Sequence, residues 1–137
     1  ELVKKLCAEF QTTDTCAVHV RGGDIVGPGR AFFERALVRM EKERPGLRYL
    51  VFTNDKEAAK EALEGEHTER KMTYISELGA FSDVDEFFLM AACRHQIISN
   101  SSYSTWAAYL NPNPEKVVIM PEYKGCEQIR LKEWIVL

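Results

Sequence analysis

The chain has 137 residues, close to the commonest size of a single domain. Its 18 lysine and arginine residues against 21 aspartate and glutamate residues give a net charge of -3. This balance lacks the basic excess of an electrostatic nucleic-acid-binding surface, so we expect no nucleic-acid partner. The apolar runs are too short to span a bilayer, and we expect no transmembrane segment in this chain.

Four cysteines are spread along the sequence without a Cys-x-x-Cys pair and without a histidine at metal-ligand spacing. They are Cys7, Cys16, Cys93 and Cys126. We interpret them as reduced, mostly buried thiols of a reducing compartment. No signal peptide is visible, so a cytoplasmic location is expected, with membrane association as the alternative.

Hydrophobic spacing predicts alternating helices and strands along the chain. The apolar positions of the predicted helices lie within residues 2–10, 33–40, 58–63, 84–92 and 102–110. The predicted strands cover residues 15–20, 49–53, 72–75, 96–99 and 117–120. Alternation of this kind predicts an α/β fold, a doubly wound Rossmann-like parallel sheet of about five strands. The segment after Pro121 has no clear pattern.

Several single residues have predicted structural roles. Asn54 and Ser82 each precede an acid three residues later and are predicted helix N-caps. Trp106 is predicted to pack in the core, with a stacking platform for a ligand as the alternative. His67 and His95 are predicted to be structural or solvated.

A cation and two glycines follow the first predicted strand. His19 and Arg21 are two residues apart, so both side chains face the same side of an extended strand. Gly22 and Gly23 allow a sharp turn and a close approach of the backbone to a ligand. Arg21 suits a phosphate, which it can bind with two parallel hydrogen bonds. The alternative is a surface arginine paired with Asp24.

Amide and hydroxyl side chains follow the fourth predicted strand, where a helix begins. They belong to Asn100, Ser101, Ser102 and Ser104. Helix N-termini bind anions because their N–H groups are free and carry partial positive charge. The alternative is capping of the helix by Asn100 or Ser101, which requires no ligand.

Acidic residues follow the second and third predicted strands. Asp55 is read as part of a helix cap, with ribose binding as the alternative. Asp83, Asp85 and Glu86 stabilise a helix dipole without any ligand. Alternatively, one of these carboxylates accepts hydrogen bonds from the adjacent ring and amino N–H groups of guanine. The sequence contains no P-loop, no Ser-His-Asp order and no metal-ligand cluster.

Three segments together resemble the α-1,2-fucosyltransferase family. Residues 19–24 (His-Val-Arg-Gly-Gly-Asp) resemble its H-x-R-R-G-D signature. Residues 85–90 and 93–98 resemble its second motif. Residues 100–106, continuing to 110–114, resemble its N-S-S-x-S-x-W pattern leading into L-N-P. The similarity covers most of the chain, and the third segment is the most specific.

The resemblance implies the second, carboxyl-terminal half of a GT-B-type inverting glycosyltransferase. Residues 1–137 would form its single donor-binding domain, without the acceptor-binding half. The implied reaction transfers L-fucose from GDP-fucose to a galactose hydroxyl of a glycan acceptor, with no metal or other cofactor. The implied donor-binding residues are His19, Arg21, Gly22, Gly23, Asp24, Asp85, Glu86, Asn100, Ser101, Ser102 and Ser104. Arg21 would be the catalytic group, stabilising charge on the departing GDP.

The chain departs from the family pattern at three positions. Gly22 replaces the second arginine, Ile25 replaces an aromatic residue and Thr105 replaces the first tryptophan of the third motif. One cation fewer is expected to weaken phosphate binding, and an arginine restored at position 22 is expected to strengthen it. The alternatives are a degenerate domain that binds only a nucleotide or a protein partner, and an unrelated doubly wound enzyme or binding module.

Overall fold

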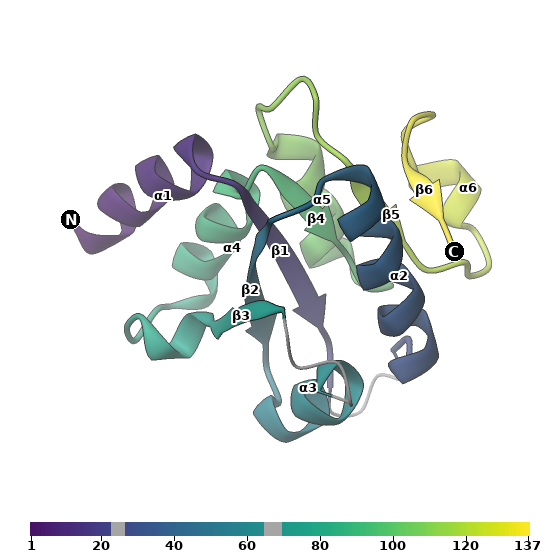
Figure 1. Ribbon diagram of the computed structural model, residues 1–137, viewed down its shortest axis with the longest axis horizontal. Coiled ribbons are helices and arrows are strands. Elements are labelled where there is room, and N and C mark those ends of the chain that lie inside the picture. Colours follow the sequence, from purple (N-terminus) through teal and green to yellow (C-terminus); the bar gives the residue numbers. More distant parts are fainter. Residues whose placement is uncertain (23–26, 65–69) are drawn as a thin grey trace.

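The computed structural model describes residues 1–22, 27–64 and 70–137. Its centre is a parallel sheet with strand order β3-β2-β1-β4-β5-β6, as Figure 1 shows in part. The strands are β1 (Thr15–Val20), β2 (Arg48–Thr53), β3 (Lys71–Tyr74), β4 (His95–Ile97), β5 (Val118–Met120) and β6 (Ile135–Val136). The predicted doubly wound, Rossmann-like α/β fold is confirmed, with six strands rather than five.

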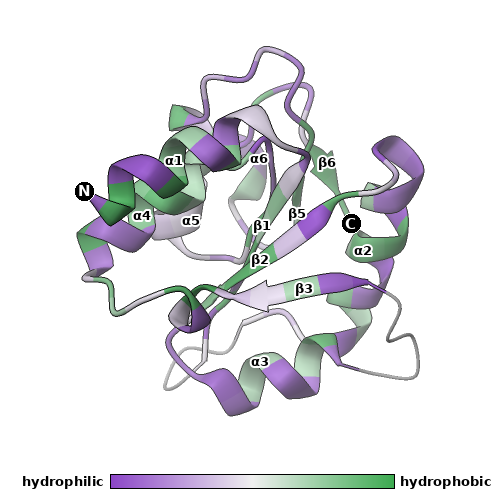
Figure 2. Cartoon of the chain, turned by 60° about the vertical axis from the view of Figure 1, so that its left-hand side comes forward, coloured by the Kyte–Doolittle hydropathy of each residue, from purple (hydrophilic) through white to green (hydrophobic). Residues whose placement is uncertain are grey.

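Helices cover both faces of the sheet. They are α1 (Leu2–Thr12), α2 (Arg30–Glu43), α3 (Lys56–Leu63), α4 (Asp83–Ala92), α5 (Ser102–Leu110) and the short α6 (Cys126–Ile129), with a 3-10 turn η1 (Ile75–Glu77) after β3. One hydrophobic cluster joins the sheet to α2 and α3, and another joins it to α1, α4 and α5. Figure 2 shows hydrophilic and hydrophobic residues alternating around α1 and α3, as expected for helices that pack one face inward.

Strand β1 is central and buried on both faces, which explains its apolar sequence. Its alternate side chains enter opposite layers. Val18 and Val20 pack in the cluster of α2 and α3, whereas Ala17 packs in the cluster of α1, α4 and α5. By the same alternation His19 faces the second layer, where its ring lies 5.6 Å from that of Tyr103 on α5.

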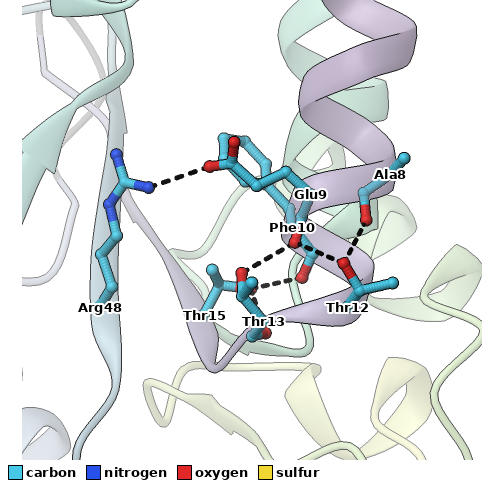
Figure 3. A network of polar contacts seen from close by, with 7 residues as sticks. All are labelled: Ala8, Glu9, Phe10, Thr12, Thr13, Thr15 and Arg48. Atoms are coloured by element: carbon cyan, nitrogen blue, oxygen red, sulfur yellow. Dashed lines mark hydrogen bonds and ion pairs between the residues drawn. The ribbon is translucent and has the colours of Figure 1, made fainter.

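Threonine hydroxyls fix the connection between α1 and β1 (Figure 3). The Thr13 hydroxyl donates to the Glu9 carbonyl at 2.8 Å, and the buried Thr15 hydroxyl donates to the Phe10 carbonyl at 2.8 Å. Arg48 at the start of β2 donates to the Glu9 carboxylate at 3.2 Å. The two threonine contacts satisfy carbonyls that the helix end would otherwise leave unpaired, and the ion pair ties the start of β2 to α1.

Two sequence predictions about local structure need correction, and one segment without a predicted structure acquires one. The N-cap of α3 is Asp55, whose carboxylate accepts from the Ala58 N–H at 3.2 Å, and not Asn54. Trp106 is 58% exposed and lies outside the core, in edge contact with Tyr109. The segment after Pro121 contains α6 and the sixth strand.

The predictions that Ser82 caps a helix, that His95 is structural and that the cysteines are free and mostly buried are confirmed. Ser82 caps α4 by accepting from the Asp85 N–H at 3.1 Å. His95 is buried and structural, since its Nδ1 accepts from the Val117 N–H at 2.9 Å. The four cysteines are free thiols, three of them buried. His67 lies outside the described residues. In the described ranges no helix combines the length and apolar character that a membrane crossing requires.

Candidate functional site

The strand order reverses between β1 and β4, and in open α/β sheets ligands bind outside the carboxyl ends of the strands at such a point. A cavity of about 440 Å³ opens there, within the size range of small-molecule sites. Its lining comes from the ends of β1 and β2 and the beginnings of α4 and α5. The lining residues are His19, Arg21, Phe52, Thr53, Asn54, Asp83, Glu86 and Tyr103.

His19 is held rigidly at the floor of this cavity. It is 6% exposed, and its Nδ1 lies 2.9 Å from the hydroxyl of Ser99, the residue that follows β4 by two positions. Burial, and secondarily the charge of Arg21, lower the pKa of His19 from 6.5 to about 4. The imidazole is therefore neutral at pH 7 and donates from one ring nitrogen only.

Arg21 lines the same cavity as His19, as their spacing predicts. Its side chain is partly buried, and its Nε is a buried atom with no hydrogen-bond partner within the ranges that the structure describes. An unsatisfied buried N–H on a charged group is costly, because the group has lost water without gaining an acceptor. A bound anion would supply that acceptor.

Gly22 is a packing position between β1 and the beginning of α3. Its N–H donates to Asn54 Oδ1 at 2.8 Å, and Asn54 Nδ2 donates back to the Gly22 carbonyl at 3.3 Å. A Cβ placed at Gly22 would lie 2.6 Å from Cβ of Asp55, too close for any real contact. Steric crowding by Asp55 thus explains why this position is a glycine. An arginine at this position would disturb the Asp55 cap instead of simply adding a phosphate ligand.

We expect Gly22→Ala to lower the free energy of unfolding by about 1–3 kcal/mol, because the new methyl group must displace Asp55. The matched control is Gly29→Ala, where the added Cβ has no neighbour within 4 Å. We expect that control to change stability by less than about 1 kcal/mol. Urea unfolding measures the free energy of unfolding of both variants. An equal, small loss of stability in the two would contradict the steric conflict between Gly22 and Asp55.

The acids of α4 separate into two groups. Glu86 and Asp83 line the cavity, and burial and then the Asp83 charge raise the pKa of Glu86. Asp85 is not in the lining. Its charge acts on Cys7 of α1, whose pKa is raised first by burial and then by this carboxylate. The sequence left Asp85 and Glu86 as equal candidates for contacting a base, and the geometry favours Glu86.

The polar residues that begin α5 differ in accessibility. Ser101 is the N-cap, with its hydroxyl accepting from the Tyr103 N–H at 3.2 Å, and Ser102 is exposed. Ser104 is fully buried, and its hydroxyl lies 3.4 Å from the Ser99 hydroxyl. Its contacts are therefore with the protein interior. Asn100 is partly buried and sits just before the cap. Tyr103, in the first turn of α5, lines the cavity.

Two buried imidazoles make the fold acid-sensitive. Burial lowers the pKa of both His19 and His95 from 6.5 to about 4, so the unfolded chain binds more protons than the folded chain between these values. Unfolding free energy should therefore fall as pH is lowered from 6.5 toward 4, by roughly 2 kcal/mol at pH 5 for one such histidine.

The measurement is urea unfolding at pH 7, 6 and 5. In His95→Gln the side-chain oxygen can still accept from the Val117 N–H, but it cannot be protonated in this range. We expect a shallower loss of stability with acid in this variant than in the wild type. Parallel pH profiles would contradict the assignment of acid sensitivity to His95.

Comparison with known protein families identifies the family to which this chain belongs. The sequence model described as Glycosyl transferase family 11 matches residues 3–137. The chain belongs to this family. The match covers nearly the whole chain and confirms the family resemblance found in the three sequence motifs.

A curated relative is the O-antigen biosynthesis glycosyltransferase WbnK of Escherichia coli, which is 28% identical over 130 residues. The alignment covers 86% of this chain and 40% of WbnK, so the chain spans about two fifths of the length of that relative. No solved structure matches the chain significantly.

Part of the lining of the carboxyl-edge cavity was not foreseen from the sequence. Phe52 lines the cavity because its register partner on β1 is His19. Tyr103 lies in the third motif, but spacing alone gave it no role. Its hydroxyl donates to the Asp83 carbonyl at 2.6 Å and joins α5 to α4 across the cavity mouth. Gly23 and Asp24, two expected donor-binding residues, lie outside the described residues.

A second, larger cavity of about 530 Å³ lies at the opposite, amino edge of the sheet. Its lining includes Gly46, Tyr49 and Arg70, and the Arg70 guanidinium there is already paired with Glu41. The smaller cavity is the better candidate for an anion-binding site, because the carboxyl edge has an arginine with an unsatisfied N–H and a helix N-terminus. Among the described residues no cluster of three histidine, cysteine or acidic side chains could hold a metal ion.

Proposed function

We propose that this domain binds GDP-fucose and provides the donor half of a fucosyltransferase that acts on a galactose hydroxyl of a glycan. Membership of glycosyl transferase family 11 supports the transferase class. The observation that carries the proposal is the position of Arg21. It extends from the carboxyl end of the central strand into the cavity, and its buried Nε has no partner in the described structure.

Arg21 would bind the diphosphate, with the beginning of α5 as a second anion-binding element. A guanidinium offers two parallel donors to phosphate oxygens, and the first turn of a helix offers free N–H groups. Ser101 and the exposed Ser102 lie at that turn and would add hydroxyl donors. Both elements would neutralise charge on the diphosphate, the kind of electrostatic stabilisation that lowers the barrier when charge develops on a leaving group.

Glu86 would recognise the guanine base of the nucleotide. A carboxylate accepts from the ring N–H and the amino group of guanine together, a pattern that neither adenine nor uracil presents. Glu86 lines the cavity beside the rings of Phe52 and Tyr103, which offer apolar surface to a planar base. The preference for a guanine nucleotide follows from this combination.

In the proposed reaction the acceptor hydroxyl attacks the anomeric carbon of fucose, and the bond to the β-phosphate oxygen breaks. Negative charge then accumulates on the departing GDP, next to Arg21. The arginine would thus act mainly by stabilising the leaving group, a role in which one such group contributes roughly 10²–10³-fold to the rate. We propose that the residues of this chain accomplish this without a metal ion.

A second candidate is a domain that binds the nucleotide without catalysing transfer. Gly22 in place of the second family arginine favours it, because one phosphate-binding cation is missing. Both candidates share the nucleotide site, and they differ in whether transfer to an acceptor occurs.

Calorimetric titration tests the proposal. The purified chain is titrated with GDP-fucose, GDP, UDP and ADP, each with and without Mg²⁺. We expect GDP and GDP-fucose to bind at least tenfold more tightly than UDP and ADP, independently of the metal. Equal affinity for the four nucleotides would contradict guanine recognition, and binding that requires Mg²⁺ would contradict a metal-free site.

A further inference from the structure

Ser99 connects the cavity floor to the beginning of α5 without lining the cavity itself. The side chain is fully buried, and its hydroxyl lies 2.9 Å from Nδ1 of His19 and 3.4 Å from the hydroxyl of Ser104. The Ser99 N–H also donates to the Ser104 hydroxyl at 3.3 Å. This buried serine pair therefore lies behind the His19 imidazole, which lines the cavity.

The distances favour His19 Nδ1 over the Ser104 hydroxyl as the acceptor of the Ser99 proton. A hydroxyl has one proton, and Ser99 has two neighbouring acceptors, of which His19 Nδ1 is the nearer. Ser104 has an acceptor of its own, the carbonyl of Ser101 at 3.4 Å. With Ser104 donating to Ser101 and Ser99 donating to His19, each hydroxyl has an acceptor and Nδ1 is left without a proton.

A neutral imidazole carries its proton on one nitrogen only. If Nδ1 accepts from Ser99, the proton must be on Nε2, the ring nitrogen for which the described structure shows no protein partner. The tautomer has a chemical consequence. Phosphate oxygens at neutral pH only accept hydrogen bonds, so a phosphate requires an Nε2–H, whereas the other tautomer would present a lone pair to an anion.

We propose that Ser99 is a positioning residue of the donor site, which donates to Nδ1 of His19 and so holds the Nε2–H ready for a ligand oxygen in the cavity. The identity of that ligand rests on the proposed function. The tautomer does not, because it depends only on contacts within the chain. Ser99 would thus act through His19 and never touch the nucleotide.

Nitrogen NMR reads the tautomer directly in the chain without ligand. The protein has 3 histidines, and the His19 signals are those lost in a His19→Gln variant. Long-range proton–nitrogen correlation at pH 7 should show the Nε2–H form in the wild type and a mixture of both forms in Ser99→Ala. Ser99→Thr, which keeps the hydroxyl, should restore the wild-type form. A wild-type Nδ1–H form would overturn the proposal, even if Ser99→Ala fails to fold.

GDP titration supplies the functional readout. We expect Ser99→Ala to bind GDP about tenfold more weakly, the effect of one hydrogen bond of about 1.4 kcal/mol. Ser99→Thr should stay within about threefold of the wild type. The matched control is Thr15→Val, which removes a fully buried hydroxyl at the far end of β1 and should cost stability without changing GDP affinity.

The outcomes distinguish the two proposals. Equal GDP affinity in Ser99→Ala and the wild type would overturn the role of Ser99 and leave the nucleotide site standing. Absence of GDP binding in the wild type would overturn the proposed function, and the NMR tautomer would then decide the Ser99 contact alone. Weakening by Thr15→Val as large as that by Ser99→Ala would show a general loss of stability and overturn the positioning role.

Discussion

Replacing Arg21 with alanine should weaken GDP binding by at least a hundredfold and leave the fold intact. Arg21 lines the cavity and carries a positive charge. Its Nε has no hydrogen-bond partner in the described structure, so the substitution leaves no partner of that atom unpaired. The change removes charge-assisted hydrogen bonds worth about 1.5–3 kcal/mol each. Calorimetry measures the affinity, and circular dichroism with urea unfolding measures the fold.

Two variants make this result specific. Arg21→Lys keeps the charge but loses the planar pair of donors, so its GDP affinity should fall between those of the wild type and the alanine variant. Arg35→Ala removes the same charge from an exposed position on α2 and should change GDP affinity less than twofold. If Arg21→Ala and Arg35→Ala have similar effects, the contribution is net charge alone and Arg21 is not a ligand.

Replacing Glu86 with glutamine should reduce the preference for guanine. The wild type should bind GDP about 10–100-fold more tightly than inosine diphosphate, because the inosine base lacks the amino group and leaves a carboxylate oxygen unpaired. In Glu86→Gln the side-chain shape remains but one strong acceptor becomes a donor. The affinity for GDP should fall about 10-fold or more, and the difference between the two nucleotides should shrink.

Asp85 is the matched control for this experiment. It is the neighbouring acid on the same helix turn, and its charge acts on Cys7 of α1, away from the cavity lining. Asp85→Asn should therefore leave the preference for GDP unchanged. Loss of the preference in Asp85→Asn, with retention in Glu86→Gln, would reverse the assignment of the base-reading residue.

The sheet and the position of the site could be predicted from the sequence because both depend on short-range patterns. Apolar runs bounded by glycine, asparagine and serine predicted the five longest strands within one or two residues. The rule that ligands bind at the carboxyl ends of parallel strands then directed attention to His19, Arg21 and the beginning of α5.

Contacts between distant segments could not be predicted in the same way. Phe52, Ser99 and Tyr103 acquire their roles from register and helix packing, which no spacing along the chain encodes. The sixth strand has two residues and depends on its pairing with β5, so it gave no periodic signal. The choice between Asp85 and Glu86 required the direction in which α4 faces its neighbours.

Gly22 shows how a local pattern can mislead. From the family signature it was interpreted as a missing cation whose restoration would improve binding. In the structure the position is filled by the approach of Asp55, and the backbone of Gly22 is paired with Asn54. An arginine at this position should lower stability because its Cβ would meet Asp55, and it is not expected to tighten GDP binding.

The most direct test of the account is to locate GDP on the chain by NMR. An amide proton–nitrogen spectrum of the labelled chain is recorded during titration with GDP to millimolar concentration. We expect the largest shifts at Arg21, Gly22 and Asn54 and in the first turn of α5, all around the cavity at the carboxyl edge. Shifts centred on Gly46, Tyr49 and Arg70 would place the nucleotide in the amino-edge cavity and contradict the account. A spectrum unchanged by GDP would contradict it equally.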